Sequence, residues 1–183
     1  MKITYNAPFV LTFTFICIAI LILDRLMVST IIVNFFTVYP DMPFQDPASW
    51  FRLVSHVVGH ANAGHLVNNF VFILLLGPML EEKYGTKRLF IFVLITALVT
   101  GLLNNFFFET GLLGASGVVF MFILLASFSN YRAGEIPLTF VLIIILFLGQ
   151  EIIRAFSSDN ISQFAHIIGG FCGSFFGFNT NSS

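Results

Sequence analysis

The chain has 183 residues, of which 57 % are hydrophobic and 9 % are charged, and its mean hydropathy is +0.95. This composition excludes an ordinary water-soluble domain and predicts a polytopic membrane protein of the all-α class. The formal net charge is -1 and no basic block stands out, so we expect no nucleic-acid partner. Cys17 and Cys172 each lie inside an apolar run, which favours buried thiols over a disulfide framework.

The apolar runs predict one bundle of six membrane-spanning helices over residues 1–183, because roughly 20 apolar residues are needed to cross about 30 Å of hydrocarbon. We expect the spans at about 5–23, 65–80, 89–108, 116–129, 137–153 and 164–178. Leu26 to Tyr39 is also apolar, but it is short and is followed by Pro40 and the polar stretch Asp41 to Ser49. We interpret it as an interfacial or half-inserted segment, although a full span here would give seven crossings.

The basic residues predict which side of the membrane holds the termini. With six spans, both termini share a side with the loops after the second and fourth spans. That side carries Lys2, Lys83, Lys87, Arg88 and Arg132, against Arg25, Arg52 and Arg154 on the other side. Because cytoplasmic loops are enriched in lysine and arginine, we expect a multi-pass plasma-membrane protein with cytoplasmic termini.

Chain direction brings four polar residues to one depth. The second, fourth and sixth spans run the same way, so their N-terminal ends lie together near the outer face. His65 and Asn69 open the second span, Ser116 opens the fourth and His166 opens the sixth. Polar side chains inside a bilayer cost free energy and usually face the interior of the bundle, where many have a function.

Ser116 and His166 form a candidate catalytic pair, because a neutral imidazole can accept the proton of a serine hydroxyl and so activate it as a nucleophile. The pair requires close approach of the fourth and sixth spans. Small residues that permit it are Gly114 and Gly117 around the serine, and Gly169, Gly173 and Gly177 on the helical face of the histidine. The alternative is that the serine and the glycines only pack one helix against another.

His65 and Asn69 are spaced i, i+4, so both side chains project from one helical face and could donate hydrogen bonds to an oxyanion beside Ser116. A purely stabilising hydrogen bond between helices is the other interpretation. Phe120 lies one turn after Ser116, where its ring would be near the base. Asp159 is expected to be solvated, so we predict a Ser-His dyad without an orienting carboxylate.

The histidines also allow a competing hypothesis. His56 and His60 are spaced i, i+4, and with His65 and His166 they could hold Zn²⁺ or another transition metal. The protein would then be a metal-binding membrane protein or a small transporter. No carboxylate or cysteine joins the set, which weighs against this interpretation.

Taken together, these motifs resemble those of the rhomboid intramembrane serine proteases. Gly114-Ala115-Ser116-Gly117 resembles the GxSG nucleophile motif, and Ala165-His166-Ile167-Ile168-Gly169 resembles the AHxxG stretch that supplies the base. The others are His60, His65 and Asn69 for HxxxxHxxxN, Gly77, Glu81 and Gly85 for GxxxExxxG, and Trp50-Phe51-Arg52 for the Trp-Arg pair of the first loop. Phe120 replaces a tyrosine that usually stacks on the catalytic histidine, and Phe51 interrupts the Trp-Arg pair.

The resemblance implies the minimal six-helix form, in a bacterial inner membrane, with its active site toward the outer face. It implies a hydrolase that cleaves transmembrane segments of other membrane proteins within the lipid bilayer. Ser116 would be the nucleophile, His166 the general base and acid, and His65, Asn69 and the Ser116 backbone N–H the oxyanion donors, with His56 and His60 structural. No metal or cofactor is expected, the oligomeric state is not indicated, and a rhomboid-like protein that binds clients without cutting them is a further alternative.

Overall fold

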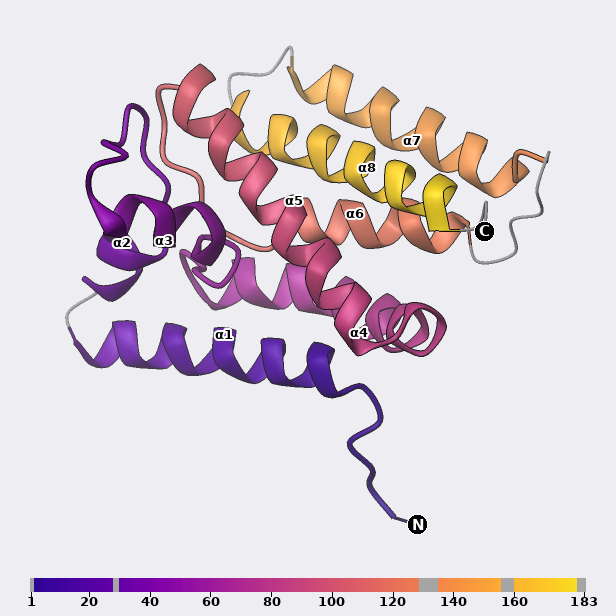
Figure 1. Cartoon of the computed structure of the whole chain (residues 1–183), viewed down its shortest axis with the longest axis horizontal. Coiled ribbons are helices and arrows are strands. Elements are labelled where there is room, and N and C mark those ends of the chain that lie inside the picture. Colours follow the sequence, from indigo (N-terminus) through magenta and orange to yellow (C-terminus); the bar gives the residue numbers. More distant parts are fainter. Residues whose placement is uncertain (1, 28–29, 129–134, 156–159, 181–183) are drawn as a thin grey trace.

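The computed structural model describes residues 2–27, 30–128, 135–155 and 160–180, and Figure 1 traces the chain. Within these residues the chain is helical, with no strand beyond an isolated bridge between Val38 and Leu112. The helices are α1 (Pro8–Leu26), α2 (Ile31–Phe35), α3 (Pro47–Ser55), α4 (Ala63–Tyr84), α5 (Thr86–Phe107), α6 (Ser116–Ser127), α7 (Leu138–Ala155) and α8 (Asn160–Thr180). The expected all-α class is therefore confirmed.

Six of these helices overlap the predicted spans, although their ends differ by a few residues. Among the described residues, α1, α4 and α5 are long and apolar enough to cross a membrane, whereas α6 is apolar but has only 12 residues. The chain is thus an integral membrane protein with several candidate spans, and the count of six stays a prediction. The expectations for Arg132 and Asp159 lie outside the described residues.

The segment between α1 and α4 is more helical than the sequence suggested. Leu26 is the last residue of α1, and among the described residues from 27 to 39 the one helix is the five-residue α2. At 1.5 Å per residue, this helix is far too short for a seventh crossing. The polar stretch from Asp41 to Ser49, for which no helix was predicted, ends in the first residues of α3. The Asp46 carboxylate accepts a hydrogen bond from Ala48 N at 2.9 Å, and Pro47 occupies the first helical position.

The alternating directions of the helices bring the candidate site residues to one end of the bundle. In Figure 1, α4, α6 and α8 begin at the end of the bundle where α2 and α3 lie, and α1, α5 and α7 begin at the opposite end. α8 packs more extensively on α6 than on any other helix. The N-termini of α4, α6 and α8, which hold the polar residues identified from the sequence, therefore gather at one end of the bundle.

Candidate active site

The loop that precedes Ser116 is held in an unusual conformation. Ser116 is the first residue of α6, and Gly114, two residues earlier, has φ of +111°, a region that glycine adopts without strain. Gly114 N donates to the His56 carbonyl at 2.9 Å, and Ala115 N donates to His60 Nε2 at 3.4 Å. The connection between α3 and α4 thus fixes the two residues that present Ser116.

His65 and Asn69 lie against the same loop. The Asn62 side chain caps α4 by accepting from His65 N at 2.9 Å, which orients the first turn of this helix. A Cβ atom added to Gly114 would lie only 2.6 Å from His65 Nε2, so the half-buried imidazole rests directly on the glycine.

Asn69 carries a buried donor without an acceptor. Its side chain is 6 % exposed, and among the described residues Nδ2 has no hydrogen-bond partner. The same added Cβ on Gly114 would lie 3.7 Å from Nδ2. A buried amide that is left unsatisfied costs free energy, and it is therefore a feature that a bound acceptor would relieve.

His166 is packed face to face with Phe120. Their ring centroids are 4.1 Å apart, the ring planes differ by 7°, and His166 is 9 % exposed. Phe120 lies one helical turn after Ser116 on α6. The stack therefore brings the imidazole of α8 to the N-terminal end of α6 and limits its rotation.

Glycines allow α6 and α8 to touch along their backbones. A Cβ atom on Gly169 would overlap the Gly117 carbonyl oxygen, and one on Gly173 would overlap the Met121 carbonyl oxygen. A Cβ atom on Gly117 would lie 3.2 Å from the carbonyl oxygen of Ala165, the residue before His166. The spacing of the glycines in the sequence thus corresponds to a real line of close contact.

Both ring nitrogens of His56 and of His60 are engaged in contacts with the protein. In His56, Nδ1 lies 3.2 Å from the Leu53 carbonyl and Nε2 lies 3.3 Å from Thr100 Oγ1. In His60, Nδ1 lies 3.0 Å from the Val58 carbonyl and Nε2 accepts from Ala115 N. Burial lowers the pKa of each to about 4, so both rings are neutral at neutral pH.

These contacts weigh against the metal hypothesis. A metal ion would have to displace hydrogen bonds that hold the loop before Ser116. In the part of the chain that the structure describes, no three side chains of histidine, cysteine, aspartate or glutamate are grouped so that they could bind one ion. In this structure the His56 carbonyl and the His60 ring instead accept hydrogen bonds from the loop before Ser116.

Sequence reasoning missed the role of Asn105, near the end of α5. Its Oδ1 accepts from Met42 N at 2.7 Å and its carbonyl accepts from Asp41 N at 3.1 Å. Val38 and Leu112 exchange two backbone hydrogen bonds of 3.0 and 2.9 Å. Residues 37–42 are therefore tied to the segment that leads into Ser116. A pair of asparagines at the end of an apolar run was the only signal.

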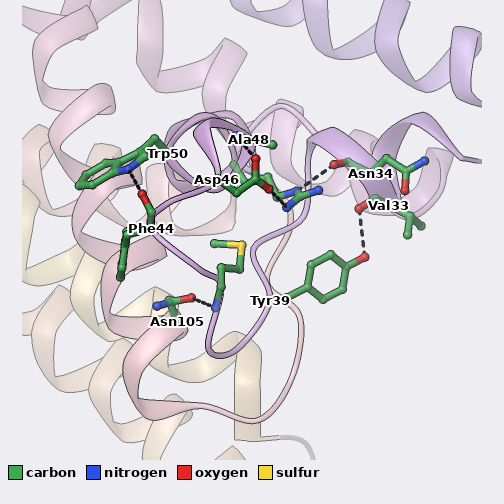
Figure 2. Close-up of polar contacts among 10 residues, drawn as sticks. Val33, Asn34, Tyr39, Phe44, Asp46, Ala48, Trp50 and Asn105 are labelled. Carbon is green, nitrogen blue, oxygen red and sulfur yellow. Dashed lines mark hydrogen bonds and ion pairs between the residues drawn. The ribbon is translucent and has the colours of Figure 1, made fainter.

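Figure 2 shows the polar contacts that hold together the segment between α1 and α4, from Val33 to Arg52. Trp50 Nε1 donates to the Phe44 carbonyl at 3.0 Å, and Arg52 Nε donates to the Asn34 carbonyl at 2.8 Å. Arg52 also pairs with Asp46, with 3.9 Å between Nη1 and Oδ2. Trp50 itself, and not Phe51, packs on Phe44, with 5.1 Å between ring centroids.

The sequence is similar to those of known proteins over most of its length. A family model described as the Rhomboid domain matches residues 47–182. The chain is 24 % identical over 143 residues to the rhomboid protease GlpG of Haemophilus influenzae, covering 76 % of this chain and 74 % of that protein. It is 28 % identical to the putative rhomboid protease YdcA and 32 % identical to the rhomboid protease GluP, both of Bacillus subtilis. Each match covers 69 % of this chain, but 64 % of YdcA and 25 % of GluP.

Proposed function

Since the chain belongs to the rhomboid family, we propose that it is an intramembrane serine endopeptidase that cleaves transmembrane segments of other membrane proteins. Its relatives carry the name rhomboid protease, which supports this class of activity. In this proposal Ser116 is the nucleophile and His166 is the general base. The observation that carries it is the α6–α8 contact, where Gly169 lies against Gly117 while His166 stacks on Phe120.

The proposed reaction has two covalent steps. His166 accepts the Ser116 hydroxyl proton as Oγ attacks the carbonyl carbon of the substrate, and it returns that proton to the nitrogen as the peptide bond breaks. Water then attacks the acyl-enzyme ester, again with His166 as base, and releases the new carboxyl group and free Ser116.

The negative charge of each tetrahedral intermediate needs nearby donors. The unsatisfied Asn69 amide, the His65 ring on Gly114 and the Ser116 backbone N–H are the groups that we assign to it. His56 and His60 support these groups without touching the substrate. No step requires a metal ion.

The membrane arrangement belongs to the same proposal. Six crossings with cytoplasmic termini place Ser116 near the outer face of a bacterial inner membrane. A peptide bond inside a helix is shielded by its own hydrogen bonds, so the substrates would be transmembrane segments with helix-weakening residues and a small residue before the cut.

A fluorophosphonate probe tests the dyad directly. We expect the detergent-purified protein to be labelled at Ser116, with labelling lost in Ser116→Ala and His166→Ala and unchanged by a metal chelator. Ser127→Ala is the matched control, because this buried serine lies on the same helix and only donates to the Leu124 carbonyl. Absence of labelling in folded protein would contradict the dyad and favour a rhomboid-like protein that binds clients without cutting them. Loss of labelling with chelator would favour the metal hypothesis.

A further inference from the structure

A groove of about 680 Å³ runs between α1 and α5, away from the residues assigned to catalysis. It extends from Pro8 and Lys87 at one end to Val57 and Ala97 at the other, and its lining is almost entirely apolar. Both helices are candidate membrane spans, so this groove opens toward the hydrocarbon of the bilayer.

The length of the groove matches one leaflet. From Lys87 to Ala97, α5 rises about 15 Å at 1.5 Å per residue. The hydrocarbon core of a bilayer is about 30 Å thick, so one acyl chain extends over about half of that depth. An acyl chain that enters at Lys87 would therefore end near the floor formed by Ala97.

Lys87 supplies a charge at the mouth of this groove. Its side chain is exposed, and within the described residues it makes no ion pair. Two of the neighbouring charged groups are engaged: Lys83 Nζ donates to the Phe128 carbonyl at 2.8 Å, and the Glu81 carboxylate accepts from Phe9 N, Val10 N and Thr86 Oγ1. Glu82 and Arg88 are exposed, but they do not line the groove. A cation at the headgroup end of an apolar groove is suited to a lipid phosphate.

We propose that this groove binds an anionic phospholipid, with one acyl chain between α1 and α5 and the phosphate on Lys87. The site is independent of the proposed peptidase activity. Bound lipid would fill the space between two helices that otherwise contact each other only sparsely, and so would stabilise the bundle.

Native mass spectrometry of the detergent-purified full chain tests this site, with phosphatidylglycerol and phosphatidylcholine added in equal amounts. We expect one phosphatidylglycerol to be retained preferentially, and Lys87→Gln to weaken its binding about fivefold. Arg88→Gln is the matched control, because Arg88 is the adjacent exposed cation but does not line the groove. Thr12→Trp, which fills the groove from the exposed face of α1, should abolish retention.

Equal retention of the two lipids, equal losses in Lys87→Gln and Arg88→Gln, or full retention in Thr12→Trp would each overturn the proposal. A photoreactive benzoylphenylalanine at Phe90, which lines the groove and is 49 % exposed, identifies the occupant in membranes. Adducts with lipid support the proposal, whereas adducts with a protein segment would assign the groove to a helix of another chain. Fluorophosphonate labelling of Ser116 in the variants reports separately on the peptidase.

Discussion

At the scale of single residues, the side-chain amide of Asn69 distinguishes a catalytic role for this residue from a structural one. A hydrogen bond that stabilises the bundle would need an acceptor, yet none of the described residues accepts from Nδ2. We therefore predict that Asn69→Ala leaves the thermal unfolding temperature nearly unchanged but slows acylation of Ser116 by about 10²–10³-fold, as expected for loss of an oxyanion donor. The measurement is the rate of fluorophosphonate labelling. Asn68→Ala, on the exposed side of the same turn, is the control. Equal rates in both variants would assign Asn69 to packing.

Substitutions at Phe120 test whether His166 needs only an aromatic ring beside it or also a hydroxyl group. Stacking on His166 needs only an aromatic face, and such contacts contribute about 0.5–1.5 kcal/mol beyond buried area. We predict that the fluorophosphonate labels Ser116 at about the wild-type rate in Phe120→Tyr and about 2- to 12-fold more slowly in Phe120→Ala. A large gain in Phe120→Tyr would instead mean that a hydroxyl is needed at this position and that the phenylalanine lowers activity.

At the scale of helices, the α6–α8 contact is sensitive to a single methyl group. A Cβ atom at Gly173 meets the Met121 backbone, which cannot move without shifting a helix, whereas one at Gly170 lies 3.5 Å from the flexible Leu124 side chain. We predict that Gly173→Ala destabilises the protein by about 1–3 kcal/mol or more, and that Gly170→Ala is nearly neutral. Thermal unfolding in detergent compares the two. Similar effects in both would show that the helices can separate at little cost.

The sequence predicted this contact because the glycines recur at helical spacing and share a face with His166. It also predicted the helices that carry Ser116, His65 and His166, since each of these residues stands at the start of an apolar run. The start of α3 was missed although Asp46 and Pro47 are an ordinary helix-start signal, because the surrounding polar residues also fit a loop. The hydrogen bond from Ala115 N to His60 joins residues 55 positions apart, and the spacing of residues in the sequence does not predict such a contact.

At the scale of the whole molecule, the alternating helix directions put α2, α3 and the α5–α6 connection at one end and the α4–α5 turn at the other. The distribution of basic residues predicts which side of the membrane Ser116 faces. Lys83, Lys87 and Arg88 all lie at the α4–α5 end. The proposed lipid site at Lys87 and the proposed active site at Ser116 would accordingly face opposite leaflets.

Single cysteines test this arrangement, because the native Cys17 and Cys172 are both buried. We predict that Gln45→Cys and Glu109→Cys react with an impermeant maleimide in intact bacterial spheroplasts. Glu82→Cys and Asn179→Cys should react only after permeabilisation, because six crossings put these exposed positions on the cytoplasmic side. The reverse pattern would place Ser116 at the cytoplasmic face and contradict cleavage from outside. Labelling of positions 45 and 82 from the same side would mean that α4 does not cross the membrane. In that case α4, α6 and α8 would not run in a common direction across the bilayer, and the proposed site depends on that common direction.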